Sequence, residues 1–204
     1  MVLKRWGRHV AISVDGRPLM SSHEHASEDE LGRMLGEHLA GIKKPKVLIG
    51  GLGMGFTLRG ALDVLPASSK IVVAELLEPV VRWNRGVLGR FAKRPLEDKR
   101  VKVIVGDVTE VINKGRGYDA IVLDVDNGPD AITRASNANL YKRAGLARAR
   151  RALKPGGFLA VWSAFGSKTF TLWLKTSGFE VKLLRPPPKT TGGPRYYIWL
   201  ARRV

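Results

Sequence analysis

Short runs of apolar, mostly β-branched residues alternate with amphipathic stretches along most of the chain. The stretches between the runs have the 3.6-residue period of helices, and one of them extends from Leu140 to Leu153, where Lys154-Pro155-Gly156-Gly157 ends it. This alternation predicts an α/β fold, a parallel sheet with helices on both faces. The runs that predict its first five strands are Val47 to Ile49, Ile71 to Ala74, Val101 to Val105, Ala120 to Leu123 and Phe158 to Trp162.

The C-terminal part of the chain predicts two further strands. A helix near Lys168 to Ser177 is followed by runs at Phe179 to Leu184 and Tyr196 to Ala201, with a Pro/Gly-rich loop between them. The two runs form an antiparallel hairpin. We therefore expect a Rossmann-like, seven-stranded, mostly parallel sheet with an antiparallel last strand.

The N-terminal part predicts a small separate element. Val10 to Val14 alternates like a strand and ends in the turn signal Asp15-Gly16, and a helix is expected from about Ser27 to Leu39. We expect a short N-terminal β-hairpin extension over residues 1–26 and a single domain over residues 27–204.

Composition excludes several kinds of chemistry. The 204 residues include no cysteine, which rules out disulfides, thiolate nucleophiles, zinc ribbons and iron–sulfur clusters. No apolar run approaches the roughly 20 residues that a bilayer demands. The first residues are basic but lack the apolar core of a secretory signal, so a cytoplasmic protein with no membrane association is expected.

The net charge of +17 is concentrated in the last third of the chain. Residues 1–130 hold 20 Lys/Arg against 17 Asp/Glu, whereas residues 131–204 hold 15 against the single acid Glu180. An RNA-associated protein is one interpretation, with Trp199 and Tyr196 as stacking surfaces; a solvated helical face is the other. The charge gathers around one helix, at Arg143, Arg148, Arg150, Arg151 and Lys154.

A glycine-rich turn follows the first strand of the main sheet. The sequence Gly50-Gly51-Leu52-Gly53-Met54-Gly55-Phe56 lies at the carboxyl end of that strand, where open α/β sheets bind ligands. The dinucleotide fingerprint would need glycine at Phe56, so a smaller nucleoside without pyrophosphate, such as S-adenosylmethionine, fits better. A plain strand-to-helix turn is the alternative.

Two acids at the ends of the next strands extend this nucleoside hypothesis. Glu75 ends the second strand, roughly 20 residues past the turn, where a carboxylate can accept both ribose hydroxyl protons. Asp107, after Gly106 at the end of the third strand, is within reach of an adenine amino group. It is equally suited to cap the helix that begins at Val108.

The fourth strand ends in an acidic segment. Asp124 continues the strand into the cleft, Asp126 shares its side if the chain stays extended, and Asp130 follows. Neighbouring carboxylates attract a cationic amine, and one with a raised pKa can take the proton that the amine must lose. An Asp-rich turn is the alternative for Asp126 and Asp130. No matching cluster completes a metal cage, so no metal is expected.

A second polar segment lies near the N-terminus, from Ser22 to Glu30. Two histidines separated by one residue suggest a metal site, but no third ligand is spaced to complete it. Ser27 and Glu30 have the spacing of a capping box for the helix that follows. Glu28 is the residue of this segment that we expect to contact substrate.

Together these motifs resemble those of the spermidine synthase family, whose members have the class I S-adenosylmethionine-dependent methyltransferase fold. The stretch Lys46 to Arg59 is similar to the family's glycine loop, and Asp124 matches the first Asp of its D-S-T-D-P catalytic loop. Ala26-Ser27-Glu28 resembles its Tyr-(His/Gln)-Glu segment, and Leu140-Tyr141 the Leu-Tyr after its gate loop. Met54 stands where the family has an Asp that holds the donor's amino group.

The resemblance implies transfer of an aminopropyl group from decarboxylated S-adenosylmethionine to a small-molecule amine, with Asp124 assisting amine deprotonation. It implies substrate contacts from Glu28, Asp126 and Tyr141, and a homodimer is a further expectation. The residues that it implies for the donor are Gly51, Gly53, Met54, Gly55, Glu75, Gly106 and Asp107. Methyl transfer from S-adenosylmethionine is the nearest alternative, because Met54 offers apolar contact in place of the carboxylate.

Overall fold

The computed structural model describes residues 1–14, 17–23, 25–125, 128–129, 138–186 and 196–204. The strands in chain order are β1 (Val2–Trp6), β2 (His9–Val14), β3 (Arg17–Ser21), β4 (Lys46–Gly50), β5 (Lys70–Glu75), β6 (Val101–Val105), β7 (Tyr118–Leu123), β8 (Leu153–Ser163), β9 (Phe179–Leu184) and β10 (Tyr197–Arg203). The helices are α1 (Ala26–His38), α2 (Phe56–Val64), α3 (Glu78–Arg85), α4 (Val108–Lys114), α5 (Ala138–Tyr141), α6 (Arg143–Ala152) and α7 (Lys168–Thr176), with short 3-10 helices at Gly89–Ala92 and Pro95–Glu97.

Seven strands form the main sheet, in the order β6-β5-β4-β7-β8-β10-β9. β4 runs parallel to β5 and β7, whereas β10 runs antiparallel to both β8 and β9. The predicted sheet with its antiparallel last strand is therefore confirmed. The chain winds outward in opposite directions from β4 and β7, so the crevice outside their carboxyl ends is where such sheets bind ligands.

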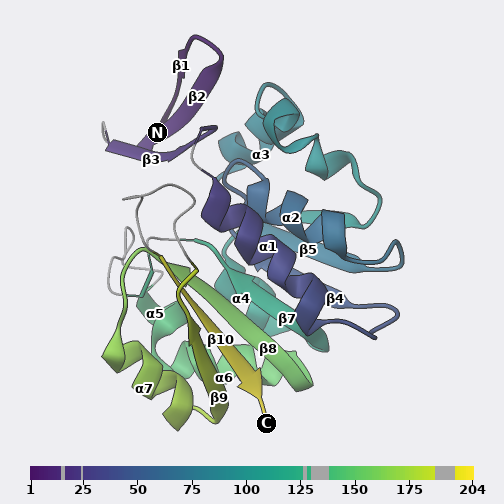
Figure 1. The fold of residues 1–204 in the computed structure, drawn as a ribbon, viewed down its shortest axis with the longest axis vertical. Helices are drawn as coiled ribbons and strands as arrows, with labels where there is room; N and C mark the ends of the chain where they lie inside the picture. Colours follow the sequence, from purple (N-terminus) through teal and green to yellow (C-terminus); the bar gives the residue numbers. More distant parts are fainter. Residues whose placement is uncertain (15–16, 24, 126–127, 130–137, 187–195) are drawn as a thin grey trace.

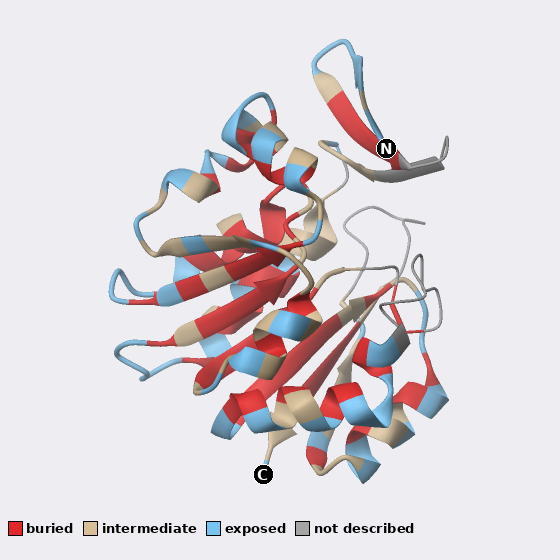
Figure 2. Cartoon of the chain, turned by 180° about the vertical axis from the view of Figure 1, so that it is seen from behind, coloured by how far each residue is buried: buried red, intermediate tan, exposed pale blue. Residues whose placement is uncertain are grey.

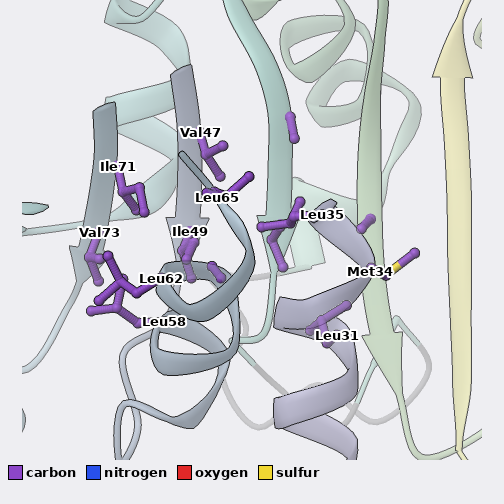
Figure 3. Close-up of a cluster of buried hydrophobic side chains, with 14 of the residues drawn as sticks. Leu31, Met34, Leu35, Val47, Ile49, Leu58, Leu62, Leu65, Ile71 and Val73 are labelled. Atoms are coloured by element: carbon purple, nitrogen blue, oxygen red, sulfur yellow. The ribbon is translucent and has the colours of Figure 1, made fainter. Parts of the chain in front are cut away.

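Both faces of the sheet are covered by helices (Figure 1). Val47 and Ile49 point to one face and pack with α1 and α2, while Leu48 between them points to the other face. All three are fully buried, as expected of a central parallel strand. Figure 3 shows the first of these clusters, to which α1 contributes Leu31, Met34 and Leu35 and α2 contributes Leu58 and Leu62. Figure 2 shows that burial follows the strands through the centre of the domain.

The N-terminal residues form an antiparallel sheet in the order β1-β2-β3. It contains the expected hairpin, β2 with β3, and adds β1 to its outer edge. Val10 and Ile12 of β2 are buried against the glycine turn and the segment after α3, in a cluster with Met54, Phe56, Leu88 and Ala92. The small sheet therefore lies over the carboxyl edge of the main sheet (Figure 1).

The helix expected over Leu140 to Leu153 is wrong in two respects. It is divided at Lys142, whose backbone is extended (φ −77°, ψ 166°), and this leaves α5 and α6 as separate helices. It also ends at Ala152, because β8 already begins at Leu153 opposite Tyr118. The segment Lys154-Pro155-Gly156-Gly157, expected to end the helix, instead bulges out of this strand, and Gly156 has a positive φ of 76° there.

Candidate active site

The glycine turn joins β4 to α2 at the switch point of the sheet. Gly51, Gly53 and Gly55 all have positive φ, of 89°, 52° and 84°. The backbone N–H of Gly51 donates to the carbonyl of Ala74 on β5, at 2.9 Å. A Cβ on Gly51 would lie 2.1 Å from the carbonyl oxygen of Asp124, so this turn can pass β7 only as glycine.

This close approach gives a prediction about stability. We expect Gly51→Ala to lower the free energy of unfolding by more than Gly156→Ala, as measured by chemical denaturation. Both positions have positive φ, which costs an alanine about 1–3 kcal/mol. A Cβ on Gly156 meets no atom within 4 Å, whereas one on Gly51 displaces the backbone of Asp124. Equal losses in the two variants would show that the approach to Asp124 is not tight.

The carboxylate of Glu75 supports the glycine turn. Its side chain is 7% exposed, and Oε2 accepts the backbone N–H of Leu52 while Oε1 accepts that of Leu77, both at 2.9 Å. Each oxygen keeps one further lone pair. Glu75 therefore faces the turn rather than bulk solvent, and its contact with ribose stays a prediction.

Asp107 caps α4. Its Oδ1 accepts the backbone N–H of Thr109 at 2.7 Å, which confirms the capping role. Gly106 donates its N–H to the carbonyl of Glu75 at 2.8 Å, so the ends of β5 and β6 are joined beside the turn. The second oxygen of Asp107 is unused by the cap, and its contact with adenine stays a prediction.

Asp124 follows β7 directly, and the structure brings it together with Glu28 of α1. Burial and, to a smaller extent, the negative charge of Glu28 raise the pKa of Asp124 to about 7, while a hydrogen bond from Thr57 opposes both effects. That bond runs from Thr57 Oγ1 to Asp124 Oδ2 at 2.7 Å. Burial also raises the pKa of Glu28. Two carboxyls that hold protons unusually well thus lie together at the carboxyl edge of the sheet.

Two glycines allow α1 to approach this edge. A Cβ on Gly32 of α1 would lie 2.2 Å from the carbonyl oxygen of Thr57, and a Cβ on Gly60 of α2 would lie 2.6 Å from that of Asp29. The two helices therefore touch through their backbones in the first two turns of each. This contact carries Glu28, one residue before Asp29, to the end of β7.

The capping box predicted for α1 is wrong. The helix begins at Ala26, one residue earlier than expected, so Ser27 lies inside the first turn and its Oγ donates instead to Glu28 Oε2 at 2.5 Å. His25 precedes the helix without a side-chain cap. Its ring stacks on Phe56 at 3.8 Å between centroids, and its Nδ1 lies 2.9 Å from Asp29 Oδ2, so it ties the start of α1 to the start of α2.

Met54 lies in the cluster beneath the N-terminal sheet. Its side chain is 1% exposed and packs among Val10, Ile12 and Phe56. The side chain of Met20 on β3 also packs closely against the turn: a Cβ added to Gly53 would lie 2.5 Å from Cε of Met20. This side of the glycine turn is thus apolar and closely covered, and a contact between Met54 and a donor stays a prediction.

Tyr141 and Asp126 are the other two residues expected to bind substrate. Tyr141 is 1% exposed, and its ring packs edge-on against Phe170 at 5.8 Å between centroids, within the cluster formed with α4 to α7. A substrate contact of Tyr141 stays a prediction. Asp126 and Asp130 lie outside the residues that the structure describes.

Three residues of this region have contacts that the sequence did not predict. Thr57 binds Asp124, and buried Asn84 donates from Nδ2 to the carbonyl of Gly53 at 2.7 Å, which holds the glycine turn from α3. Tyr196 lies close to α1, since burial and the negative charges of Glu30 and Glu28 raise the pKa of its hydroxyl. The spacing Gly32-x-x-x-Gly36 signals the close contact of α1 with α2 that lies beside Thr57. Asn84 had no comparable signal, and Tyr196 was expected only as a stacking surface for RNA.

Among the described residues, no group of three or more His, Cys, Asp or Glu side chains is placed to hold a metal ion. Among the helices of that same part, none is long and apolar enough to cross a membrane.

The fold and the site define a class of protein: an α/β domain whose switch point, where such folds bind ligands, carries a glycine turn held by a buried acid, beside a pair of carboxyls. Residues 30–171 match the family described as the spermine/spermidine synthase domain. The match spans more than half of the chain, and the protein belongs to this family.

Curated relatives match part of their own length. A polyamine aminopropyltransferase of Saccharolobus islandicus is 34% identical over 117 residues, 56% of this chain and 38% of the relative. Polyamine aminopropyltransferase 2 of Caldanaerobacter subterraneus subsp. tengcongensis is 33% identical over 101 residues, 48% of this chain and 33% of the relative. The matched part thus amounts to between 33% and 38% of each relative.

Solved structures confirm the predicted fold class. Spermidine synthase from Thermotoga maritima superposes with a TM-score of 0.71 at 20% identity, over 96% of this chain and 66% of that one. A spermidine synthase in complex with the transition state analogue AdoDATO has a TM-score of 0.70 at 19% identity, over 96% of this chain and 65% of that one. The precorrin-6y C5,15-methyltransferase of Geobacter metallireducens has a TM-score of 0.62 at 16% identity, over 86% and 88%. The fold is therefore shared with methyltransferases.

Proposed function

We propose that the protein transfers an aminopropyl group from decarboxylated S-adenosylmethionine to a small-molecule amine. The observation that carries the proposal is the pairing of Glu28 with Asp124 beside the glycine turn and Glu75. Family membership supports the reaction, and the relatives named as aminopropyltransferases support the donor.

The residues around the turn fit a nucleoside donor. Both oxygens of Glu75 keep a lone pair for the ribose hydroxyls, and the second oxygen of Asp107 is free of the helix cap for the adenine amino group. Gly51 and Gly53 let ligand atoms approach the backbone. When bound, the sulfonium donor supplies a carbon activated for substitution.

The acids near Asp124 fit a cationic acceptor. Glu28, Glu30 and Asp124 provide negative charge, and the ring of Tyr196 lies beside them. Tyr196 stacks on Trp162 at 6.5 Å between centroids, so an aromatic surface adjoins the acids. Carboxylates and aromatic faces both attract ammonium groups, which suits an amine joined to a short alkyl chain.

Asp124 is the proton acceptor of the proposed step. The acceptor nitrogen forms a bond to the aminopropyl carbon next to sulfur, the carbon–sulfur bond breaks, and its electron pair stays on sulfur as a neutral thioether, methylthioadenosine. The proton released from nitrogen passes to Asp124. Substitution at a sulfonium needs little covalent help, so alignment of the two reactants and one base is sufficient.

An assay with two donors tests the proposal. With decarboxylated S-adenosylmethionine and a set of diamines, we expect methylthioadenosine and an amine longer by one aminopropyl group, detected by mass spectrometry. The apolar surroundings of Met54 favour methyl transfer as the second candidate. S-adenosylhomocysteine formed from S-adenosylmethionine would establish that candidate instead, and no product from either donor would refute both. A homodimer stays a prediction, which light scattering tests.

The charge of Glu28 predicts a shift in the pH profile. Asp124 must be deprotonated to act, so we expect kcat to rise with pH around a midpoint of about 7. Glu28→Gln removes the negative charge that raises this pKa, and its midpoint is therefore expected at lower pH, with a higher KM for the amine. Glu37→Gln, an exposed acid in the last turn of α1, is the matched control and should keep the midpoint. The acceptor ammonium titrates near pH 10 and affects all variants alike. An unshifted midpoint in Glu28→Gln would contradict the coupling.

A further inference from the structure

The main sheet separates two helix layers of opposite charge. In α1 to α3, acids outnumber bases by two: Glu28, Asp29, Glu30, Glu37, Asp63 and Glu78 against Arg33, Arg59, Arg82 and Arg85. In α4 to α7, bases outnumber acids by six: Lys114, Arg143, Arg148, Arg150, Arg151, Lys168 and Lys175 against Glu110. This basic layer includes α4 and α6 behind the sheet in Figure 1, and Figure 2 shows that side with exposed outward turns.

Several basic side chains in or near this layer are already engaged in hydrogen bonds or ion pairs within the protein. Arg150 donates from Nε to the carbonyl of Gly178 at 3.1 Å and from Nη2 to that of Val204 at 3.0 Å. Lys154 pairs with buried Asp119 at 2.7 Å. Lys114 pairs with the layer's single acid, Glu110, at 3.5 Å.

The remaining cations form what we call the α6–α7 face, defined by Arg143, Arg148, Arg151, Lys168 and Lys175. Within the described part of the chain, no ion pair involves any of these five. Glu180, the one acid after residue 130, points elsewhere: Phe179 and Val181 pack in the cluster with α7, so Glu180 between them faces the opposite side of the sheet. Within the described ranges, no acid therefore compensates the charge of this face.

The uncharged residues exposed beside these cations argue against a lipid surface as the partner. On α6, Ala144 and Ala147 lie exposed between the arginines, and the rise of about 1.5 Å per residue separates Arg143 from Arg151 by about 12 Å. Alanine gives no large apolar side chain to insert into a lipid surface. On α7 the exposed apolar side chain is Leu172, and among the exposed residues of α6 and α7 there is no aromatic ring.

The aromatic surfaces expected to accompany this charge are not available to it. Trp199 is fully buried, its ring edge-on to Phe170 and its Nε1 donating to Thr171 at 2.8 Å. Tyr196 lies with the acids of α1. Phe165, just before α7, is 60% exposed, but it is a single ring, and the exposed positions of α6 and α7 offer no row of rings on which successive unpaired bases could stack.

We propose that the α6–α7 face binds the phosphate backbone of double-stranded nucleic acid without sequence preference. Arginine guanidinium groups pair with phosphate oxygens through two parallel hydrogen bonds, and three of the five cations are arginines. Backbone contact alone accounts for binding without base readout. The inference is independent of the proposed transfer reaction, because the face lies on α6 and α7 and contains none of the residues placed in the site.

Salt dependence of binding to a 20-base-pair DNA duplex tests the proposal. Five phosphate contacts predict a slope of log K against log salt of about −4.5, so affinity should fall by about 500-fold between 50 and 200 mM salt. The triple variant Arg143→Gln, Arg148→Gln, Arg151→Gln should reduce the slope to about −1.8, a fall of about 12-fold. The corresponding triple change to lysine keeps the charge and should keep most of the slope.

A matched control separates this face from net charge. Lys43, Lys44 and Lys70 are exposed and lie away from α6 and α7, and their triple change to Gln lowers the net charge by the same amount. We expect this variant to bind like the parent. Equal losses in the two glutamine triples, absence of binding at 50 mM salt, or tighter binding to anionic phospholipid vesicles than to the duplex would each overturn the proposal.

Discussion

Asp124→Asn is expected to lower kcat by about 10²–10⁴-fold, the usual contribution of a positioned base, while the KM for the donor changes little. The amide has nearly the shape of the carboxyl, and its oxygen can still accept the hydrogen bond from Thr57. It cannot take the proton that the amine must lose. Steady-state kinetics at pH 8, where Asp124 of the parent is mostly ionised, measures the difference.

Stability distinguishes this loss from misfolding. The folded protein raises the pKa of Asp124 from 3.8 to about 7, so it holds the proton better than the unfolded chain does. Stability contributed by the protonated form is therefore lost as pH rises between these values, and above pH 7 the ionised carboxylate is a cost to the fold. We expect Asp124→Asn to be at least as stable as the parent at pH 8.

Asp63→Asn removes a carboxylate that pairs with Arg59 on the exposed side of α2, and it should keep kcat within about twofold. If Asp124→Asn keeps kcat within tenfold of the parent, the proton leaves by another route and Asp124 is not the base.

The strands and the turn chemistry were predictable because local sequence determines them. Val47 to Ile49 and Ala120 to Leu123 are uniformly apolar because central parallel strands are buried on both faces. Gly51 was recognisable since only glycine adopts its conformation at low cost so close to another backbone. The spacing from the turn to Glu75 reflects one strand–helix–strand unit, which a linear sequence displays directly.

The rest depended on contacts between distant segments. The break at Lys142 leaves no local mark, because lysine is a good helix former. Ser27 fitted a capping box, yet the approach of Gly32 to α2 and the stack of His25 on Phe56 fix the start of α1 one residue earlier. Tyr196 reaches the acids of α1 through the sheet order, which the sequence near it does not contain.

The site is also more compact than its motifs suggest. The glycine turn is held on three sides: Glu75 binds it from β5, Asn84 from α3, and the apolar side chains of β2 and β3 cover Met54 and Gly53. A turn fixed in this way needs little rearrangement to receive a ligand, which reduces the entropy lost on binding. Of these supports, Glu75 is the one placed to act on both the turn and the ligand.

Glu75→Ala should therefore impair folding stability and donor binding together. The change leaves the N–H groups of Leu52 and Leu77 without their acceptor, at about 1–3 kcal/mol for each buried donor that water does not reach. It also removes the proposed acceptor of two ribose hydroxyl protons. Since hydrogen bonds to charged groups contribute about 1.5–3 kcal/mol each, affinity for methylthioadenosine should fall by more than about 100-fold.

Thermal denaturation and calorimetry with methylthioadenosine measure the two effects separately. Glu78→Ala is the matched control: this acid begins α3 three residues later, is exposed, and lies 3.8 Å from Arg82, an ion pair that contributes little. It should change neither quantity appreciably. Because the ribose contact and the support of the turn involve different lone pairs of Glu75, a variant that is destabilised but binds the nucleoside at parental affinity would place the ribose elsewhere and leave Glu75 a purely structural acid.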